Sequence, residues 1–103
     1  MSVYLHVTLE VASKGLPRFL EAMKETAVPI LEAQGWRLAG AFIQRSGRLG
    51  VVIDLWELDD FQHYDRALAV LSADARFPAF KAVLDDTVIS ETVVFADRAS
   101  YMH

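Results

Sequence analysis

The sequence predicts an α+β fold in which helices cover one face of a single antiparallel sheet. A period-two apolar pattern opens the chain, an amphipathic helical pattern follows, and a strand, strand, helix, strand series completes it. The length of 103 residues fits one domain, which we expect to span residues 1–103. With 53% hydrophobic and 23% charged residues, the composition is that of a globular chain and excludes intrinsic disorder.

The first half of the chain begins with a strand and continues as a helix. Residues 3–11 alternate between apolar and polar side chains, which is typical of a strand with one aliphatic face. Apolar residues recur at helical spacing over residues 16–31 and predict an amphipathic helix. Pro17 suits its first turn and Gly35 its end. Pro29 lies inside the pattern and lacks a backbone N–H, so we expect a bend or interruption there.

A hairpin and a second helix follow. Residues 36–45 and 49–57 are typical of two strands joined by a turn in which Gly47 is available for a positive φ. Asp59 predicts a helix N-cap, because Gln62 three positions later completes a capping box. The sequence therefore places a helix immediately after the hairpin.

The end of the chain completes the order of elements. Residues 72–74, Ser-Ala-Asp, interrupt the second helix, and a short amphipathic segment continues it. Residues 87–96 are rich in β-branched side chains and predict a closing strand. The order is β-α-β-β-α(α)-β, which defines a ferredoxin-like split βαβ sandwich.

The alternation within the strands predicts which side chains face the helices. The row from Leu49 to Leu55 is aliphatic, so we expect it to lie under the helices with the odd-numbered row of the first strand. The other face would then carry a mixed set of side chains: Tyr4, His6, Thr8, Val52, Asp54 and Trp56, with Trp36, Leu38, Gly40 and Phe42 from one row of the second strand. Covering several hundred Å² of apolar surface stabilises an assembly by several kcal/mol, at about 25 cal/mol per Å². We therefore expect a homodimer with its two sheets face to face, a dimeric α/β barrel.

Asp54 is the most informative residue, because it interrupts an apolar strand. A buried carboxylate needs a partner or a raised pKa. If His6 lies beside Asp54 on the neighbouring strand, the carboxylate could orient the imidazole as a general base, and we take this pair as the candidate catalytic site. The alternative is a structural polar pair, or an Asp that meets water at the barrel mouth.

Aromatic residues on the same predicted face form a candidate ligand pocket. Tyr4, Thr8, Trp56 and Phe42 would line it for an aromatic or otherwise apolar molecule. The alternative is ordinary packing between protomers. His63 falls on the second helix and is expected on its solvated side.

Charge and composition exclude several other functions. The net charge of -4 is unsuited to nucleic acid, and no stretch approaches the roughly 18 apolar residues of a membrane helix, so neither nucleic acid nor a membrane is an expected partner. The absence of Cys and the scattered His residues argue against a metal, and no Gly-rich loop indicates a nucleotide. We therefore expect no cofactor. The opening residues show no basic or long apolar leader, so a cytoplasmic location is expected.

Several short motifs together resemble the NIPSNAP family. These are Leu55-Trp56 before the acidic pair Asp59-Asp60, Ala73-Asp74 before Phe77-Pro78-Ala79-Phe80, and Pro29 and Leu31 ahead of Gly35-Trp36. The resemblance covers nearly the whole chain. Three positions depart from the family pattern: Asp54 stands where a His often precedes the Trp, and Ala75 and Phe77 replace a Pro and a Trp.

The resemblance implies a dimeric α/β barrel that binds a small molecule and has no assigned activity. The same architecture occurs in cofactor-independent monooxygenases of antibiotic biosynthesis and in muconolactone isomerases. One alternative function is therefore an enzyme of that type acting on an aromatic or enolic substrate. Another is a non-catalytic interaction module whose barrel only holds the dimer together.

Overall fold

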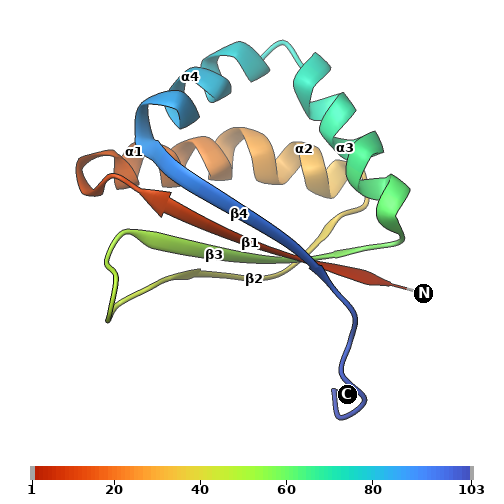
Figure 1. The fold of residues 1–103 in the computed structure, drawn as a ribbon. Helices are drawn as coiled ribbons and strands as arrows, with labels where there is room; N and C mark the ends of the chain where they lie inside the picture. Colours follow the sequence, from red (N-terminus) through yellow and green to blue (C-terminus); the bar gives the residue numbers. More distant parts are fainter. Residues whose placement is uncertain (1, 103) are drawn as a thin grey trace.

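A four-stranded antiparallel sheet carries all the helices on one face (Figure 1). The computed structural model describes residues 2–102. The strands are β1 (Val3–Val11), β2 (Arg37–Ile43), β3 (Val51–Leu58) and β4 (Val88–Ala96). The helices are α1 (Leu16–Ala22), α2 (Val28–Ala33), α3 (Phe61–Ala73) and α4 (Phe77–Thr87). The strand order β2-β3-β1-β4 confirms the predicted ferredoxin-like arrangement.

The first amphipathic segment is one helical rod with a local change of winding. A π-helical segment, Met23–Ala27, separates α1 from α2, and the N–H of Val28 donates to the carbonyl of Met23. Pro29 occupies the first turn of α2, where its missing N–H costs least. The predicted interruption at Pro29 is confirmed, and it takes the form of a π-helical turn rather than a break.

The helix after the hairpin begins one residue later than predicted. Asp60, not Asp59, is the N-cap of α3, and its Oδ1 accepts a hydrogen bond of 2.8 Å from the N–H of His63. The buried residues of α3 are His63, Ala67 and Leu71, spaced four residues apart on one side of the helix. His63 therefore lies on the buried side and not on the predicted solvated side.

The predicted facing of β1 is confirmed, and that of β3 is wrong. Val7 of β1 is buried under the helices, and Asp54 of β3 lies directly opposite it. The row that faces the helices is therefore Val52, Asp54, Trp56 and Leu58, whereas Ile53, Leu55 and Glu57 face away. Both rows of β3 are mostly apolar, so alternation alone does not fix its orientation.

A β-bulge divides the row that was predicted for the second strand. The register of β2 on β3 shifts between Leu38 and Gly40, so that Leu38 pairs with Trp56 and Phe42 pairs with Ile53. Leu38 therefore faces the helices, and Phe42 belongs to the opposite row. The prediction that Trp36, Leu38, Gly40 and Phe42 share one face is wrong for this reason.

The connection from β2 to β3 depends on Gly50. Its φ is 82°, and a Cβ atom there would lie 2.6 Å from the carbonyl oxygen of Val11. Its own carbonyl accepts a 2.8 Å hydrogen bond from the N–H of Val11. A side chain at Gly50 would collide with the backbone of Val11. Because a positive φ lies outside the β region, β3 begins after Gly50, at Val51, and not at the predicted Leu49.

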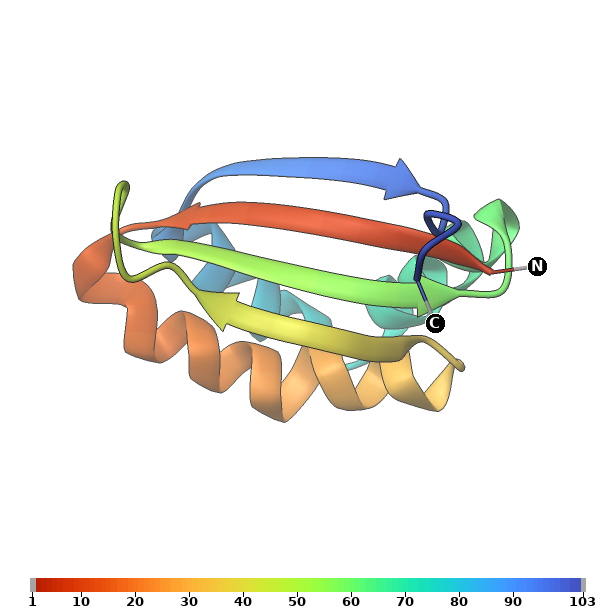
Figure 2. The same cartoon turned by 90° about the horizontal axis from the view of Figure 1, so that it is seen from below.

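Among residues 2–102, no helix lies over the far face of the sheet (Figure 2). The segment after β4 turns away from the sheet on this open side (Figure 1). Within residues 2–102, none of the helices has the length and apolar character needed to cross a membrane.

Candidate functional site

Asp54 lies at the centre of the helix-covered face. It pairs with Val7 of β1 on one side and Ala41 of β2 on the other, and its exposed fraction is 5%. No hydrogen bond or ion pair to its carboxylate forms among residues 2–102. Burial without a charged partner raises the pKa of Asp54 from 3.8 to about 6. A carboxyl in this state is a marker of a functional site.

A cavity of about 270 Å³ separates the sheet from the helices beside Asp54. Its walls are mainly aliphatic and aromatic, and the aromatic members are Trp36, Trp56, Tyr64, Phe77 and Phe80. Its polar side chains are Asp54, Tyr64, Ser72 and Glu91, and no Lys, Arg or His of residues 2–102 belongs to its lining. An apolar pocket with a few polar groups is the usual form of a small-molecule site.

The aromatic rings form a continuous wall from the interior to the β4 edge. Trp36 meets Trp56 edge-on with ring centroids 5.4 Å apart, and stacks on Tyr64 at 5.8 Å. Tyr64 in turn contacts Phe95 of β4 at 5.2 Å. Partial burial, together with the nearby charges of Glu91 and Asp65, raises the pKa of the Tyr64 hydroxyl. The phenol therefore stays protonated at neutral pH and can donate a hydrogen bond.

Asp54 also borders a second, outer groove. This groove has a volume of about 340 Å³ and runs between β2 and the first helical rod, where Met23, Lys24 and Phe42 line it. Asp54 is therefore the polar residue common to the inner cavity and to the groove at the sheet edge. A ligand that reaches Asp54 from either side meets the same carboxylate.

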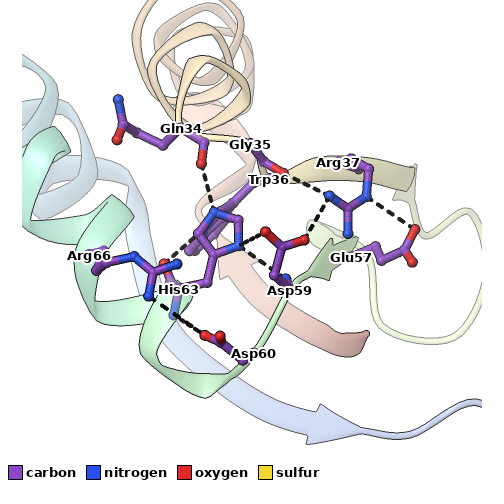
Figure 3. Close-up of polar contacts among 9 residues, drawn as sticks. All are labelled: Gln34, Gly35, Trp36, Arg37, Glu57, Asp59, Asp60, His63 and Arg66. Atoms are coloured by element: carbon purple, nitrogen blue, oxygen red, sulfur yellow. Dashed lines mark hydrogen bonds and ion pairs between the residues drawn. The ribbon is translucent and has the colours of Figure 1, made fainter. Parts of the chain in front are cut away.

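His63 lies beside Trp36, one of the residues that line the cavity (Figure 3). It is 3% exposed, which shows that the predicted surface position is wrong. Its Nδ1 accepts a hydrogen bond of 3.0 Å from the N–H of Asp59, so its Nε2 carries the proton and donates to the carbonyl of Gln34 at 2.6 Å. Its own carbonyl accepts a 3.2 Å bond from the indole N–H of Trp36. Both ring nitrogens are occupied, so His63 is a positioning residue.

Arg37 forms a set of polar contacts at the protein surface next to Trp36 (Figure 3). Its guanidinium pairs with Glu57 at 3.3 Å and with Asp59 at 3.2 Å, and donates to the carbonyl of Gly35 at 3.1 Å. These groups are largely exposed, so each pair contributes little to stability. Their effect is to set the position of Trp36, which lies between Gly35 and Arg37 in the chain.

The predicted pair of His6 and Asp54 does not form. His6 lies opposite Leu55, is exposed, and points to the open face, whereas Asp54 points to the helices. The two side chains lie on opposite faces of the sheet, because the facing of β3 is the reverse of the predicted one. A mechanism in which Asp54 orients His6 is therefore wrong.

The predicted ligand-binding residues are divided in the same way. Trp56 shares a face with Asp54 and is 2% exposed, as predicted, but that face is the one under the helices. Tyr4 and Thr8 alternate with buried neighbours and lie on the open face, where the row of Phe42 also belongs. Of the predicted site residues, the inner cavity therefore brings together Asp54 and Trp56.

Sequence reasoning missed Tyr64, Ser72 and Glu91 as cavity residues. Tyr64 follows the helical spacing of Leu68 and Leu71, which could have placed it on the inner side of α3. Glu91 pairs with Leu9 in the row of β4 that faces the helices, and it remains exposed at the edge. Within residues 2–102, no group of three or more His, Asp and Glu side chains could hold a metal ion.

The fold and the site together define a class: ferredoxin-like α+β proteins with a cavity between sheet and helices. Residues 4–95 match the NIPSNAP family model, and the chain belongs to the NIPSNAP family. This confirms the resemblance seen in the sequence. A comparison with curated proteins gave no match.

Solved structures agree with this assignment. An uncharacterised NIPSNAP domain protein from Burkholderia xenovorans is 26% identical, with a TM-score of 0.81 over 100% of this chain and 99% of that one. A NIPSNAP family protein from Agrobacterium tumefaciens is 18% identical, with a TM-score of 0.85 over 98% and 91% of the two chains. A candidate antibiotic biosynthesis monooxygenase from Caulobacter crescentus is 15% identical, with a TM-score of 0.70 over 96% and 91%. The last two likenesses show the fold alone.

Proposed function

We propose that this NIPSNAP chain is a small-molecule-binding protein whose inner cavity holds a mainly apolar, aromatic molecule against Asp54. The observation that carries the proposal is an unpaired carboxyl, 5% exposed, in the wall of an aromatic cavity of about 270 Å³. Natural proteins keep such costly groups mainly where function requires them. A cytoplasmic setting, expected from the sequence, is part of the same proposal.

A test of the proposal compares two neighbouring positions on β4. Val93 lines the cavity, whereas Val94 is 48% exposed on the open face. We expect Val93→Trp to fill the cavity mouth and weaken binding of naphthylmethanol at least tenfold by calorimetry. Val94→Trp adds the same side chain outside the cavity and should bind as the wild type does. Equal binding by both variants would place the ligand elsewhere, and no binding by the wild type would remove the proposal.

A second candidate function is an enzyme that uses Asp54 as its base. The observation in its favour is that the pKa of Asp54 is raised to about 6, close to the value that suits a general base at neutral pH. In an isomerase, the carboxylate would remove a proton from the carbon beside a carbonyl group and return it to another carbon, which needs no oxidant or cofactor. Deuterium exchange into a cyclic enone that is lost in Asp54→Asn would support this function over simple binding.

We also propose that two copies of the chain associate through the open face of the sheet. Exposed or half-buried apolar side chains crowd this face, among them Phe42, Ile53, Leu55 and Val94. Polar pairs surround them, with Arg37–Glu57 at one end and Arg48–Glu10 at the other, 2.7 Å apart. An apolar centre with a polar rim is the usual anatomy of a protein interface. The tail after β4, with exposed Tyr101 and Met102, lies on the same side (Figure 1).

The dimer is tested by placing a charge at the centre of the open face. Leu55 is half-buried there and pairs with His6 of the central strand β1. We expect Leu55→Glu to give a monomer by light scattering at micromolar concentration, because two like charges would meet across the two-fold axis. Arg48→Gln, a control at the rim of the open face, should still give the mass of a dimer by light scattering. A wild-type chain with the monomer mass of 11.5 kDa at high concentration would contradict the proposed interface.

A further inference from the structure

The charges around the inner cavity have one sign. Asp54 lies in its interior and Glu91 at its β4 edge, while Tyr64 and Ser72 contribute hydroxyl groups. In the described part of the chain, residues 2–102, no Lys, Arg or His lines this cavity. An anionic ligand would therefore meet repulsion, and a neutral one would leave both carboxylates without a cation.

Among residues 2–102, no cation pairs with the Asp54 carboxylate, although this side chain is only 5% exposed. A buried carboxylate without a compensating cation or hydrogen bond is strongly disfavoured, and proteins almost always pair such groups. Lys24 borders the outer groove together with Asp54, but no ion pair between these two side chains forms among residues 2–102. The missing partner is therefore one that a ligand can supply.

The aromatic wall suits a cation as well as an apolar body. Trp and Tyr rings attract ammonium groups through their negatively polarised faces, and the attraction is larger where water is excluded. Trp36, Trp56 and Tyr64 are consecutive members of this wall, and Trp56 stands two residues from Asp54 on the same face of β3. A protonated amine beside Asp54 would thus meet both a carboxylate and aromatic rings.

We infer that the cavity selects an organic cation, an aromatic or aliphatic body that carries a protonated amine, with Asp54 as its counter-ion. This inference rests on the proposed small-molecule function and names the chemical class of the ligand. The chain's net charge of -4 favours the approach of such a cation from solution.

Three probes that share one naphthalene ring test the charge preference. Naphthylmethylamine is cationic at neutral pH, naphthylmethanol is neutral, and naphthoate is anionic. By calorimetry we expect the amine to bind at least tenfold more tightly than the alcohol, and naphthoate to bind more weakly than either. A charge-assisted hydrogen bond of the usual strength accounts for a ratio of this size.

Matched variants assign the preference to Asp54. Asp54→Asn keeps the shape and removes the charge, so the amine-to-alcohol affinity ratio should fall close to one. Asp65→Asn removes an exposed charge from α3, outside the cavity lining, and should keep the wild-type ratio. If Asp54→Asn does not fold, the wild-type ratio measured against pH gives the same information, because it should fall as Asp54 is protonated below about pH 6. Tyr64 does not titrate near pH 6, because its pKa is raised from the ordinary value of 10. Glu91 is the other carboxylate of the lining, and Glu91→Gln should keep the pH dependence of the affinity ratio.

The outcomes separate this inference from the proposed function. If the alcohol binds as tightly as the amine, or naphthoate binds best, the cation preference is wrong and the small-molecule function stands. If the wild type binds none of the probes, both are wrong. If the amine is preferred but Asp54→Asn keeps that preference, Asp54 is not the counter-ion and the inference is overturned.

Discussion

Replacing Asp54 by Asn should stabilise the folded protein at neutral pH and lose that advantage in acid. The folded protein holds the Asp54 proton with a pKa of about 6, whereas the unfolded chain releases it with the ordinary value of 3.8. Between these values the native state binds more protons, so wild-type stability falls as pH rises. Above pH 6 the buried carboxylate is charged and lowers the free energy of unfolding of the wild type by on the order of 3 kcal/mol, at 1.36 kcal/mol per pKa unit. An amide at this position does not ionise and escapes this cost.

Denaturant unfolding of both proteins between about pH 3 and about pH 7 measures this effect. The free energy of unfolding of Asp54→Asn, relative to the wild type, should rise across that range by about 2–3 kcal/mol. Asp65→Asn is the matched control, because it removes an exposed carboxyl. Parallel pH profiles for Asp54→Asn and the wild type would mean that the carboxyl is not buried in an apolar cavity.

Removing Trp56 should cost more than any other single change considered for this site. Its side chain is 2% exposed and packs edge-on against Trp36 at 5.4 Å. Trp56→Ala should therefore lower the free energy of unfolding by about 3–5 kcal/mol, the usual range for large-to-small changes in a core. Trp36 stays in place as a fluorescent reporter of unfolding.

The conservative change Trp56→Phe keeps an aromatic ring on the cavity wall and should lose much less stability than Trp56→Ala. Surface substitutions usually fall within about 0.5 kcal/mol of the wild type. A loss of that size for Trp56→Ala would contradict the burial of Trp56 beneath the helices.

The order of elements could be predicted from the sequence because each element carries its own periodic signal. Alternation in residues 3–11 predicts a strand, and helical spacing in residues 16–31 predicts a helix. The structure confirms both. The facing of β3 could not be read in the same way, because both of its rows are apolar. The ends of those rows held a usable signal: the outward row ends in Glu57, which is half-buried, and the inward row ends in Leu58, which is fully buried.

The site could be predicted only in part, since it depends on where two local irregularities fall. The β-bulge between Leu38 and Gly40 places Leu38 under the helices, whereas Gly40 and Phe42 lie on the open face as predicted. The N-cap at Asp60 instead of Asp59 could not be selected by residue type, because both residues are equally good caps. His63 lies inside through tertiary contacts, in which its ring donates to the Gln34 carbonyl and its own carbonyl accepts from Trp36.

Asp54 could be selected from the sequence, but its surroundings could not. A single carboxyl in an apolar strand is conspicuous wherever the strand faces. Its true neighbours, Tyr64 of α3 and Glu91 of β4, come from elements distant in the sequence and meet only across the cavity. Pairing it with His6 followed from an incorrect facing of one strand.

The most direct test of the account is a titration of the Asp54 carboxyl followed by carbon NMR, with and without the naphthalene probes. We expect a midpoint of about 6 in the free protein, because burial in the cavity raises the pKa of this group. Saturating naphthylmethylamine should lower the midpoint, since an adjacent cation favours the carboxylate. A midpoint at the ordinary value of 3.8 that none of the probes moves would contradict the account.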